Sequence, residues 1–176
     1  EHILWKQYKS YMQQFGLVGD HPVVVYEEDS TLNYTSIVDL DGTVAQMVGR
    51  KPFDWDKVGT DLPRHAIINM VCAEGLKNGH LTFMSGRDGS CYEATKAWIE
   101  DYIMDSTMDS VSWDLVMRVP DDWRKDDVVK YELYNKHIKG KYNVASVFDD
   151  RLTCIRLWSI LGLPNIIQVG EYNNEF

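Results

Sequence analysis

The sequence is short of basic residues, has no closely spaced cysteine pair and contains no long apolar run. With 18 lysines and arginines against 27 aspartates and glutamates, the formal net charge is −9. This argues against a protein that tracks a long nucleic-acid backbone, although it allows a site that grips one phosphate. The three cysteines form no CxxC pair, which favours a reduced, intracellular protein. Because no apolar run could cross a bilayer, we expect no membrane association and a cytoplasmic location.

The 176 residues, 44% of them hydrophobic, suit one domain with a buried core and an extension. From residue 35 onward, short apolar runs alternate with segments of helical periodicity. This predicts an α/β fold with a mostly parallel sheet flanked by helices. We expect strands at 35–38, 81–84, 113–119, 144–148 and 166–169. We expect helices at 63–76, 92–103, 126–138 and from about 151 to 161.

Two other segments have less regular patterns. Residues 44–62 are rich in glycine, proline and charge, and we expect a loop or small flap over the strand ends rather than a large cap. Residues 1–34 are expected to form an N-terminal extension, with a helix over 1–16 and a short strand at 23–26. The main domain is then expected to span residues 35–176.

One stretch joins a predicted buried strand to two carboxylates. The run at 35–38 ends in Asp39 and Asp41, one residue apart, followed by Gly42 and Thr43. Ligands of open parallel sheets bind beyond the carboxyl ends of the strands. Two like charges this close need neutralising, and Mg2+, which takes oxygen ligands, is the natural partner. The alternative interpretation is a solvated Asp-Gly turn.

Two further predicted strands also end in polar clusters. Ser85-Gly86-Arg87 follows one strand, and Asp149-Asp150 follows another. In a parallel sheet these ends share an edge with Asp39. Together with a cationic helix that contains Lys130, the three clusters favour a metal and phosphate site over three solvated loops.

These side chains have the chemistry that phosphoryl transfer requires. Asp39 is the candidate nucleophile, and Asp41 the candidate acid and base. Arg87 and Lys130 would supply positive charge around the phosphate, and Ser85 a hydrogen bond. The candidate metal ligands are Asp39, Asp41, Asp149 and Asp150.

Each of these residues also has a purely structural interpretation. Arg87 could pair with Asp88 at the surface, and Lys130 could pair with Asp126 one helical turn away. Asp149-Asp150 could cap the following helix.

The order Asp39-Leu40-Asp41-Gly42-Thr43, Ser85, Lys130, Asp149-Asp150 resembles the four motifs of the haloacid dehalogenase superfamily, in the form typical of its phosphatases. The resemblance implies a Rossmann-like fold. A narrower resemblance, to the 3′-phosphatase domain of phage-type polynucleotide kinase–phosphatases, rests on the segments 47–50, 52–54, 84–87, 124–130 and 149–151. That family removes 3′-phosphates from DNA or RNA ends in nucleic-acid repair, with Mg2+.

The narrower resemblance also implies roles for individual residues. Arg50, Arg87 and Lys130 would be the cations of the phosphate site, and Asp126 a supporting residue. Asp149 and Asp150 would serve the metal and orient Lys130. Thr43, Ser85 and Gly86 belong to the same motifs and are expected to line the phosphate site.

No GxxxxGK[ST] stretch is present, so the chain looks like the phosphatase half of such an enzyme, with a 5′-kinase domain expected in the parent protein if one exists. If the protein is encoded by a phage, it would act in the cytoplasm of the host cell. The sequence leaves open whether the protein forms a homo-oligomer. One rival is the same chemistry on a free nucleotide or sugar phosphate. Another is a non-catalytic binding domain that uses the N-terminal segment.

Overall fold

The computed structural model describes residue 10 and residues 26–170. Apart from residue 10, the expected helix at 1–16 therefore lies outside the described residues, and so does nearly all of the expected strand at 23–26. A five-stranded sheet, in which every strand pair is parallel, forms the centre of the described part in the order β5-β4-β1-β6-β7. Its strands are β1 (Tyr34–Val38), β4 (His80–Asp88), β5 (Ser112–Arg118), β6 (Asn143–Asp149) and β7 (Ile166–Gln168).

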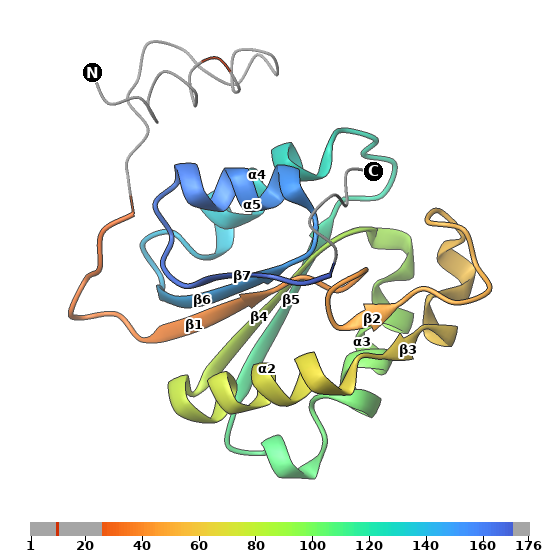
Figure 1. Cartoon of the computed structure of the whole chain (residues 1–176), viewed down its shortest axis with the longest axis horizontal. Coiled ribbons are helices and arrows are strands. Elements are labelled where there is room, and N and C mark those ends of the chain that lie inside the picture. Colours follow the sequence, from red (N-terminus) through yellow and green to blue (C-terminus); the bar gives the residue numbers. More distant parts are fainter. Residues whose placement is uncertain (1–9, 11–25, 171–176) are drawn as a thin grey trace.

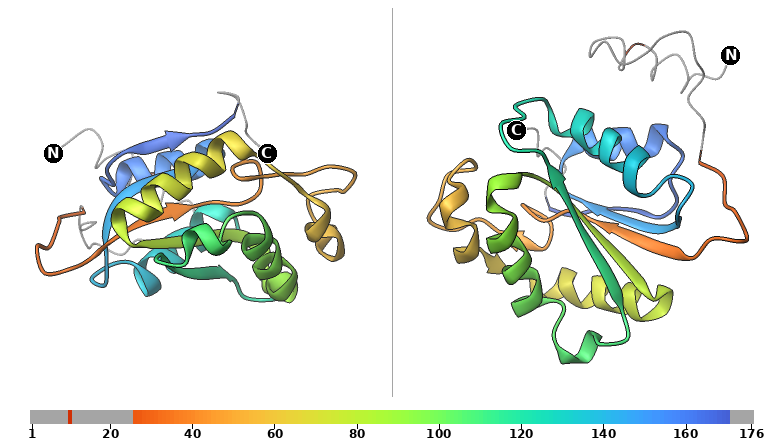
Figure 2. Two further views of the ribbon diagram at one scale, coloured as in Figure 1. Left: turned by 90° about the horizontal axis from the view of Figure 1, so that it is seen from below. Right: turned by 180° about the vertical axis from the view of Figure 1, so that it is seen from behind.

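Two layers of helices cover the two faces of this sheet (Figures 1 and 2). On one face lie α2 (His65–Asn78) and α3 (Tyr92–Tyr102), and on the other lie α4 (Asp126–His137) and α5 (Leu152–Ile160). Short 3-10 turns occur at η1 (Trp55–Thr60), η2 (Gly89–Cys91) and η3 (Ser106–Met108). The predicted α/β fold with a parallel sheet is confirmed.

Side chains of the central strand alternate between the two layers, as extended geometry requires. Ile37 belongs to the core beneath α4 and α5, together with Val147 of the neighbouring strand. Val38 belongs to the core beneath α2 and α3, together with Phe83 and Phe148. Ile37 and Val38 thus bury apolar side chains on opposite faces of the sheet, and the charged side chains that follow them lie beyond the carboxyl end of the strand.

The segment after β1 folds into a small flap, which we define as residues 44–63. It contains the short strands β2 (Ala45–Gln46) and β3 (Leu62–Pro63), paired antiparallel, with η1 between them. Figure 1 shows it as a separate small element beside the sheet. The sequence predicted this flap, but the helix expected from Pro63 was placed two residues early. Pro63 pairs with Ala45 in β3, and α2 begins at His65.

The other predicted boundaries agree with the structure within a few residues, apart from one strand. β4 continues through Asp88, so that Ser85, Gly86 and Arg87 lie within the strand rather than after it. The register with β5 shifts between Ser85 and Asp88. Among the residues described, no helix has the length and apolar character needed to cross a membrane.

Candidate active site

Lys130 and two aspartates form a buried ion-pair centre at the carboxyl ends of β1 and β6. Lys130 Nζ lies 2.7 Å from Asp39 Oδ1 and 2.8 Å from Asp149 Oδ2. The lysine residue is only 1% exposed, although it comes from a helix whose composition suggested an ordinary surface lysine. Thr43 Oγ1 donates a hydrogen bond to the other oxygen of Asp39 at 3.0 Å. The interpretation of Lys130 as a solvated partner of Asp126 is therefore wrong.

Asp150 brings a third carboxylate to this centre. Asp39, Asp149 and Asp150 are all buried, and each offers an oxygen within 4.8 Å of the others. Burial and the neighbouring Asp149 raise the pKa of Asp150 to about 6. Burial also raises the pKa of Asp39, and Lys130 opposes that rise.

Three carboxylates facing one ammonium leave an excess of negative charge in a buried space. An all-oxygen donor set of this kind fits Mg2+, a hard divalent cation. Asp149 is well occupied by protein contacts, because its Oδ2 also accepts from Trp158 Nε1 at 3.0 Å and its Oδ1 accepts from the Arg151 backbone N–H at 3.2 Å. The latter bond lies just before α5, whose N-cap is Arg151 without a side-chain capping bond, so the interpretation of Asp149-Asp150 as the cap of this helix is wrong.

Gly42 allows this close approach. Its φ is +83°, in the left-handed region, and a Cβ at this position would overlap the Asp150 carboxylate. Only a residue without a side chain fits here, which explains the glycine in the motif that follows the two aspartates.

Asp41 lies in a second charged group, formed with two arginines. Arg50 Nη2 and Arg87 Nη2 each lie 2.7 Å from Asp41 Oδ1. Both guanidiniums also bind the buried carboxylate of Asp61, at 2.6 Å from Arg50 and 2.7 Å from Arg87. Two arginines and two aspartates thus form a closed square that links the flap to β4. The Asp41 side chain belongs to this square and not to the carboxylate group around Asp39.

Arg87 is held by further contacts on every side. Its Nη1 donates to Thr95 Oγ1 at 3.2 Å, and its backbone N–H donates to Ser85 Oγ at 3.1 Å. The alternative pairing with Asp88 is wrong, because Asp88 accepts instead from the backbone N–H groups of Ser90 and Asp121.

Asp126 supports the site from the first turn of α4. It forms ion pairs with Arg118, at the end of β5, and with Arg151, whose Nη1 lies 2.6 Å away. A Cβ on Gly86 would overlap the Asp126 carboxylate, so β4 and α4 meet closely here. The two arginines and this carboxylate fix the start of the helix that carries Lys130.

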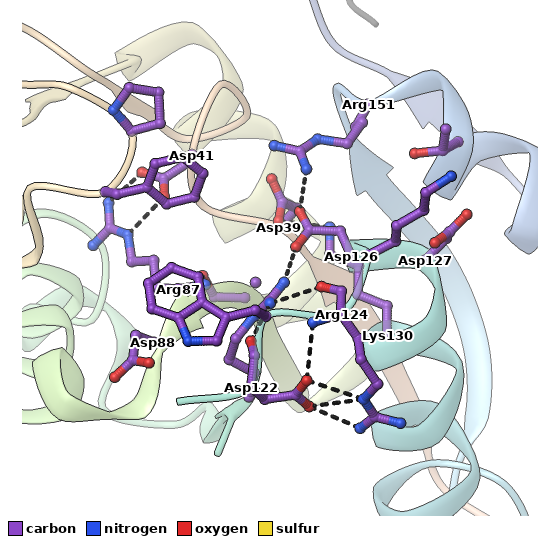
Figure 3. Close-up of a pocket in the computed structure, with 18 of the residues that line it drawn as sticks. Asp39, Asp41, Arg87, Asp88, Asp122, Arg124, Asp126, Asp127, Lys130 and Arg151 are labelled. Atoms are coloured by element: carbon purple, nitrogen blue, oxygen red, sulfur yellow. Dashed lines mark hydrogen bonds and ion pairs between the residues drawn. The ribbon is translucent and has the colours of Figure 1, made fainter. Parts of the chain in front are cut away.

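A cavity of about 520 Å³ opens above these groups. Figure 3 shows Asp39, Asp41, Arg87, Asp126, Lys130 and Arg151 around it. It is also lined by Ser85, Gly86 and Asp150. All three polar strand ends expected from the sequence therefore meet at one cavity.

Several residues that line this cavity, and one that lies behind it, were not predicted as site residues. Asp61 has no motif around it, and only the folded flap reveals that it bridges Arg50 and Arg87. Arg118 closes β5, so the rule that strand ends carry function could have identified it. Phe53, Trp55 and Trp123 also line the cavity.

Residues 33–174 match a family model described as the polynucleotide kinase PNKP phosphatase domain. A curated relative is 42% identical over 144 residues: the putative bifunctional polynucleotide kinase/RNA ligase of Autographa californica nuclear polyhedrosis virus. The match covers 80% of this chain but only 20% of that protein. The chain thus spans about a fifth of the length of this relative.

Solved structures of a Pnkp1/Rnl/Hen1 RNA repair complex contain a similar fold. One match has a TM-score of 0.72 and 28% identity, and it covers 93% of this chain and 53% of that chain. A second has the same TM-score and 29% identity, and it covers 88% of this chain and 53% of that chain.

Proposed function

The chain belongs to the family of polynucleotide kinase (PNKP) phosphatase domains, within the haloacid dehalogenase superfamily, and we propose that it removes the 3′-terminal phosphate from DNA or RNA ends. The arrangement that carries this proposal is a pair of charged groups, each with members that line one cavity. One contains Asp39 and Lys130, and the other contains Asp41 and two arginines. A nucleophile, an acid and three cations are the parts that phosphoryl transfer requires.

In the first step, an oxygen of Asp39 attacks phosphorus and the bond from phosphorus to the 3′ oxygen breaks. The product is an aspartyl-phosphate and a nucleic-acid end that needs a proton on its new hydroxyl. Lys130, 2.7 Å from the attacking carboxylate, orients it and stabilises charge on the phosphoryl oxygens. Thr43 donates a hydrogen bond to the second oxygen of Asp39, and this bond fixes the orientation of the carboxylate.

Asp41 supplies that proton and later takes one from the attacking water. In the substrate-free arrangement both arginines donate hydrogen bonds to the Asp41 side chain. An incoming phosphate dianion competes for the same guanidiniums, because Arg50 and Arg87 suit bidentate contact with phosphate oxygens. We propose that the phosphate takes over these contacts, so that Asp41, released from the arginines, takes up a proton from solvent and stands beside the leaving oxygen as its proton donor.

In the second step, water loses a proton to Asp41 and attacks the phosphorus of the aspartyl-phosphate. Inorganic phosphate leaves, and Asp39 is restored as a carboxylate. Asp39, Asp149 and Asp150 would hold Mg2+, which when bound supplies charge neutralisation to the phosphoryl oxygens.

Comparing substrates tests the reaction directly. Phosphate release is measured from a 3′-phosphorylated oligonucleotide, a 5′-phosphorylated oligonucleotide of the same sequence, a 3′-mononucleotide and an aryl phosphate. We expect the first to have the highest kcat/KM. Equal rates on all four would indicate a small-molecule phosphatase, and no release from any of them by a folded protein would indicate a binding domain.

A thermal shift tests the metal site without relying on activity. Mg2+ should raise the Tm of the wild-type protein, because an ion that binds only the folded state stabilises it. In Asp150→Asn, which keeps the shape but removes a charge, the shift should shrink. NaCl at the same ionic strength is the control for general salt effects.

The matched segment makes up 20% of the viral relative, and a longer parent protein is part of this proposal. The viral relative is described as a putative bifunctional polynucleotide kinase/RNA ligase. We propose that the parent protein likewise combines this phosphatase with an end-modifying domain, and that it acts in the cytoplasm of its host cell.

A further inference from the structure

Two exposed aromatic side chains line the cavity that contains the charged centre. Phe53 is 68% exposed and Trp123 is 72% exposed, the highest values among the exposed large hydrophobic side chains of the described residues. Both line the same cavity as Asp39 and Lys130. Exposing aromatic rings to water is unfavourable, and these rings do not contribute to the core. A cluster of exposed apolar side chains at the entrance of a cavity is typical of a ligand-binding site.

The two rings come from opposite walls. Phe53 belongs to the flap, and Trp123 belongs to the loop between β5 and α4. Their centroids lie 6.3 Å apart with an interplanar angle of 59°, and the Phe53 ring also meets Trp55 edge to face at 5.8 Å. A flat ring between Phe53 and Trp123 needs about 7 Å, which is two stacking contacts of about 3.5 Å. A small opening of the flap, together with a rotation of one ring toward parallel, would supply that space.

The loop that carries Trp123 is anchored at several points. Arg118 Nη1 donates to the carbonyl oxygens of Asp122 at 2.6 Å and of Arg124 at 2.9 Å. The Arg124 side chain is in turn paired with Asp122 and with Glu132 of α4. The indole is therefore exposed on a braced loop, which lowers the entropy lost when a ligand stacks on it.

Resting on the proposed function, we propose that Phe53 and Trp123 bind the base of the 3′-terminal nucleotide while its phosphate occupies the charged centre. The occupant is thus the unpaired end of a single-stranded nucleic acid. One nucleotide carries both the aromatic base and the anionic phosphate that this cavity is suited to bind. Stacking on aromatic side chains tolerates any base, because every base has a π-face.

A site that stacks the terminal base should discriminate between different kinds of nucleic-acid ends. A base inside a flush duplex is already paired and stacked, and freeing it costs energy. Single-stranded and 3′-overhanging ends are therefore bound more tightly than blunt ends, with little dependence on the identity of the last base.

Binding measurements on the inactive Asp39→Asn protein test this without turnover. Fluorescence anisotropy gives the Kd of a 3′-phosphorylated oligonucleotide and of the same oligonucleotide ending in an abasic 3′-phosphate. We expect the base-bearing end to bind about tenfold more tightly, within the range of stacking effects measured on other proteins. Adding Trp123→Ala should remove most of that ratio.

Three further variants separate stacking from simple apolar cover. Trp123→Phe should keep most of the ratio, and Trp123→Leu, apolar but not aromatic, should lose it. Tyr92→Ala removes an exposed ring of α3 outside this cavity and should change nothing. Equal binding of the two ends, no binding of either, or full rescue by leucine overturns the proposal. The proposed function fails separately, when the wild-type protein releases no phosphate from the oligonucleotide.

Discussion

The two ends of the parallel sheet bury polar side chains in different ways. At the amino end, Thr35 Oγ1 lies 2.9 Å from Thr82 Oγ1 and 2.9 Å from His80 Nδ1. The imidazole of His80 stacks on Tyr142, with centroids 4.5 Å apart. At the carboxyl end of the same strands, the buried groups are carboxylates, a lysine and arginines. Only the carboxyl end of the strands carries an excess of buried charge.

The difference separates groups that stabilise the fold from groups that await a ligand. Hydroxyl and imidazole groups can satisfy one another without net charge, which is inexpensive inside a protein. Buried like charges are costly unless something pairs with them. The amino end is complete without a ligand, and the carboxyl end has the electrostatics of a site that becomes complete when a cation binds.

The largest contrast is expected from Asp39→Asn at one end and Thr35→Val at the other. Asp39→Asn should lower kcat at least about a thousandfold, since it removes the nucleophile, while its Tm stays at or above that of the wild type because one crowded charge is gone. Thr35→Val should lower the Tm and leave kcat unchanged. Wild-type turnover in Asp39→Asn would show that another group attacks phosphorus.

Lys130→Met should produce the next largest effect, on kcat rather than on KM. The variant keeps the volume of the side chain but removes the charge that faces Asp39 and Asp149. We expect kcat to fall about a hundredfold or more, as when other pre-organised charge-stabilising groups are removed. Steady-state kinetics on the 3′-phosphorylated oligonucleotide measure both constants. A rise in KM alone would make Lys130 a residue that only binds the ground state.

Gly42→Ala and Gly140→Ala form a matched pair for the metal site. Both glycines have positive φ, +83° and +71°, so each variant should lose about 1–2 kcal/mol of stability from backbone strain. Only at Gly42 does the added Cβ reach Asp150, whereas Gly140 has open space. The Mg2+-induced rise in Tm should therefore disappear in Gly42→Ala and persist in Gly140→Ala. Equal responses would place the ion away from Asp150.

The strands and helices could be read from the sequence because their signals are local. Apolar runs, glycine stops and the alternation of elements gave the parallel sheet, and the strand-end rule gathered Asp39, Arg87 and Asp149 at one edge. The start of α2 was misplaced because Pro63 is equally suited to a helix start and to a strand, and pairing with Ala45 decides between them.

The parts that escaped prediction depend on long-range contacts. Asp61 acts only because the flap folds back and brings it between Arg50 and Arg87. Whether the Asp41 carboxylate faces a metal or the arginines is decided by the turn after β1. The pairing of Phe53 with Trp123 joins residues 70 positions apart, so no local pattern contains it.

The smallest effect is expected from acid titration at the amino end. His80 is buried, and this burial lowers its pKa below 6.5 although Asp114 lies 3.4 Å from its Nε2. The unfolded chain therefore binds a proton at His80 before the folded protein does, and stability falls as the pH drops below about 6.5. Unfolding by urea at pH 7.5 and pH 5.5 should show a smaller pH-dependent loss in His80→Gln than in the wild type. The pKa of His137 is also lowered by burial, so His137→Gln should reduce the loss in the same direction and serves as the comparison for a histidine outside the Thr35 network. If His80→Gln keeps the full loss, the amino end does not contain the neutral imidazole on which its contrast with the charged end depends.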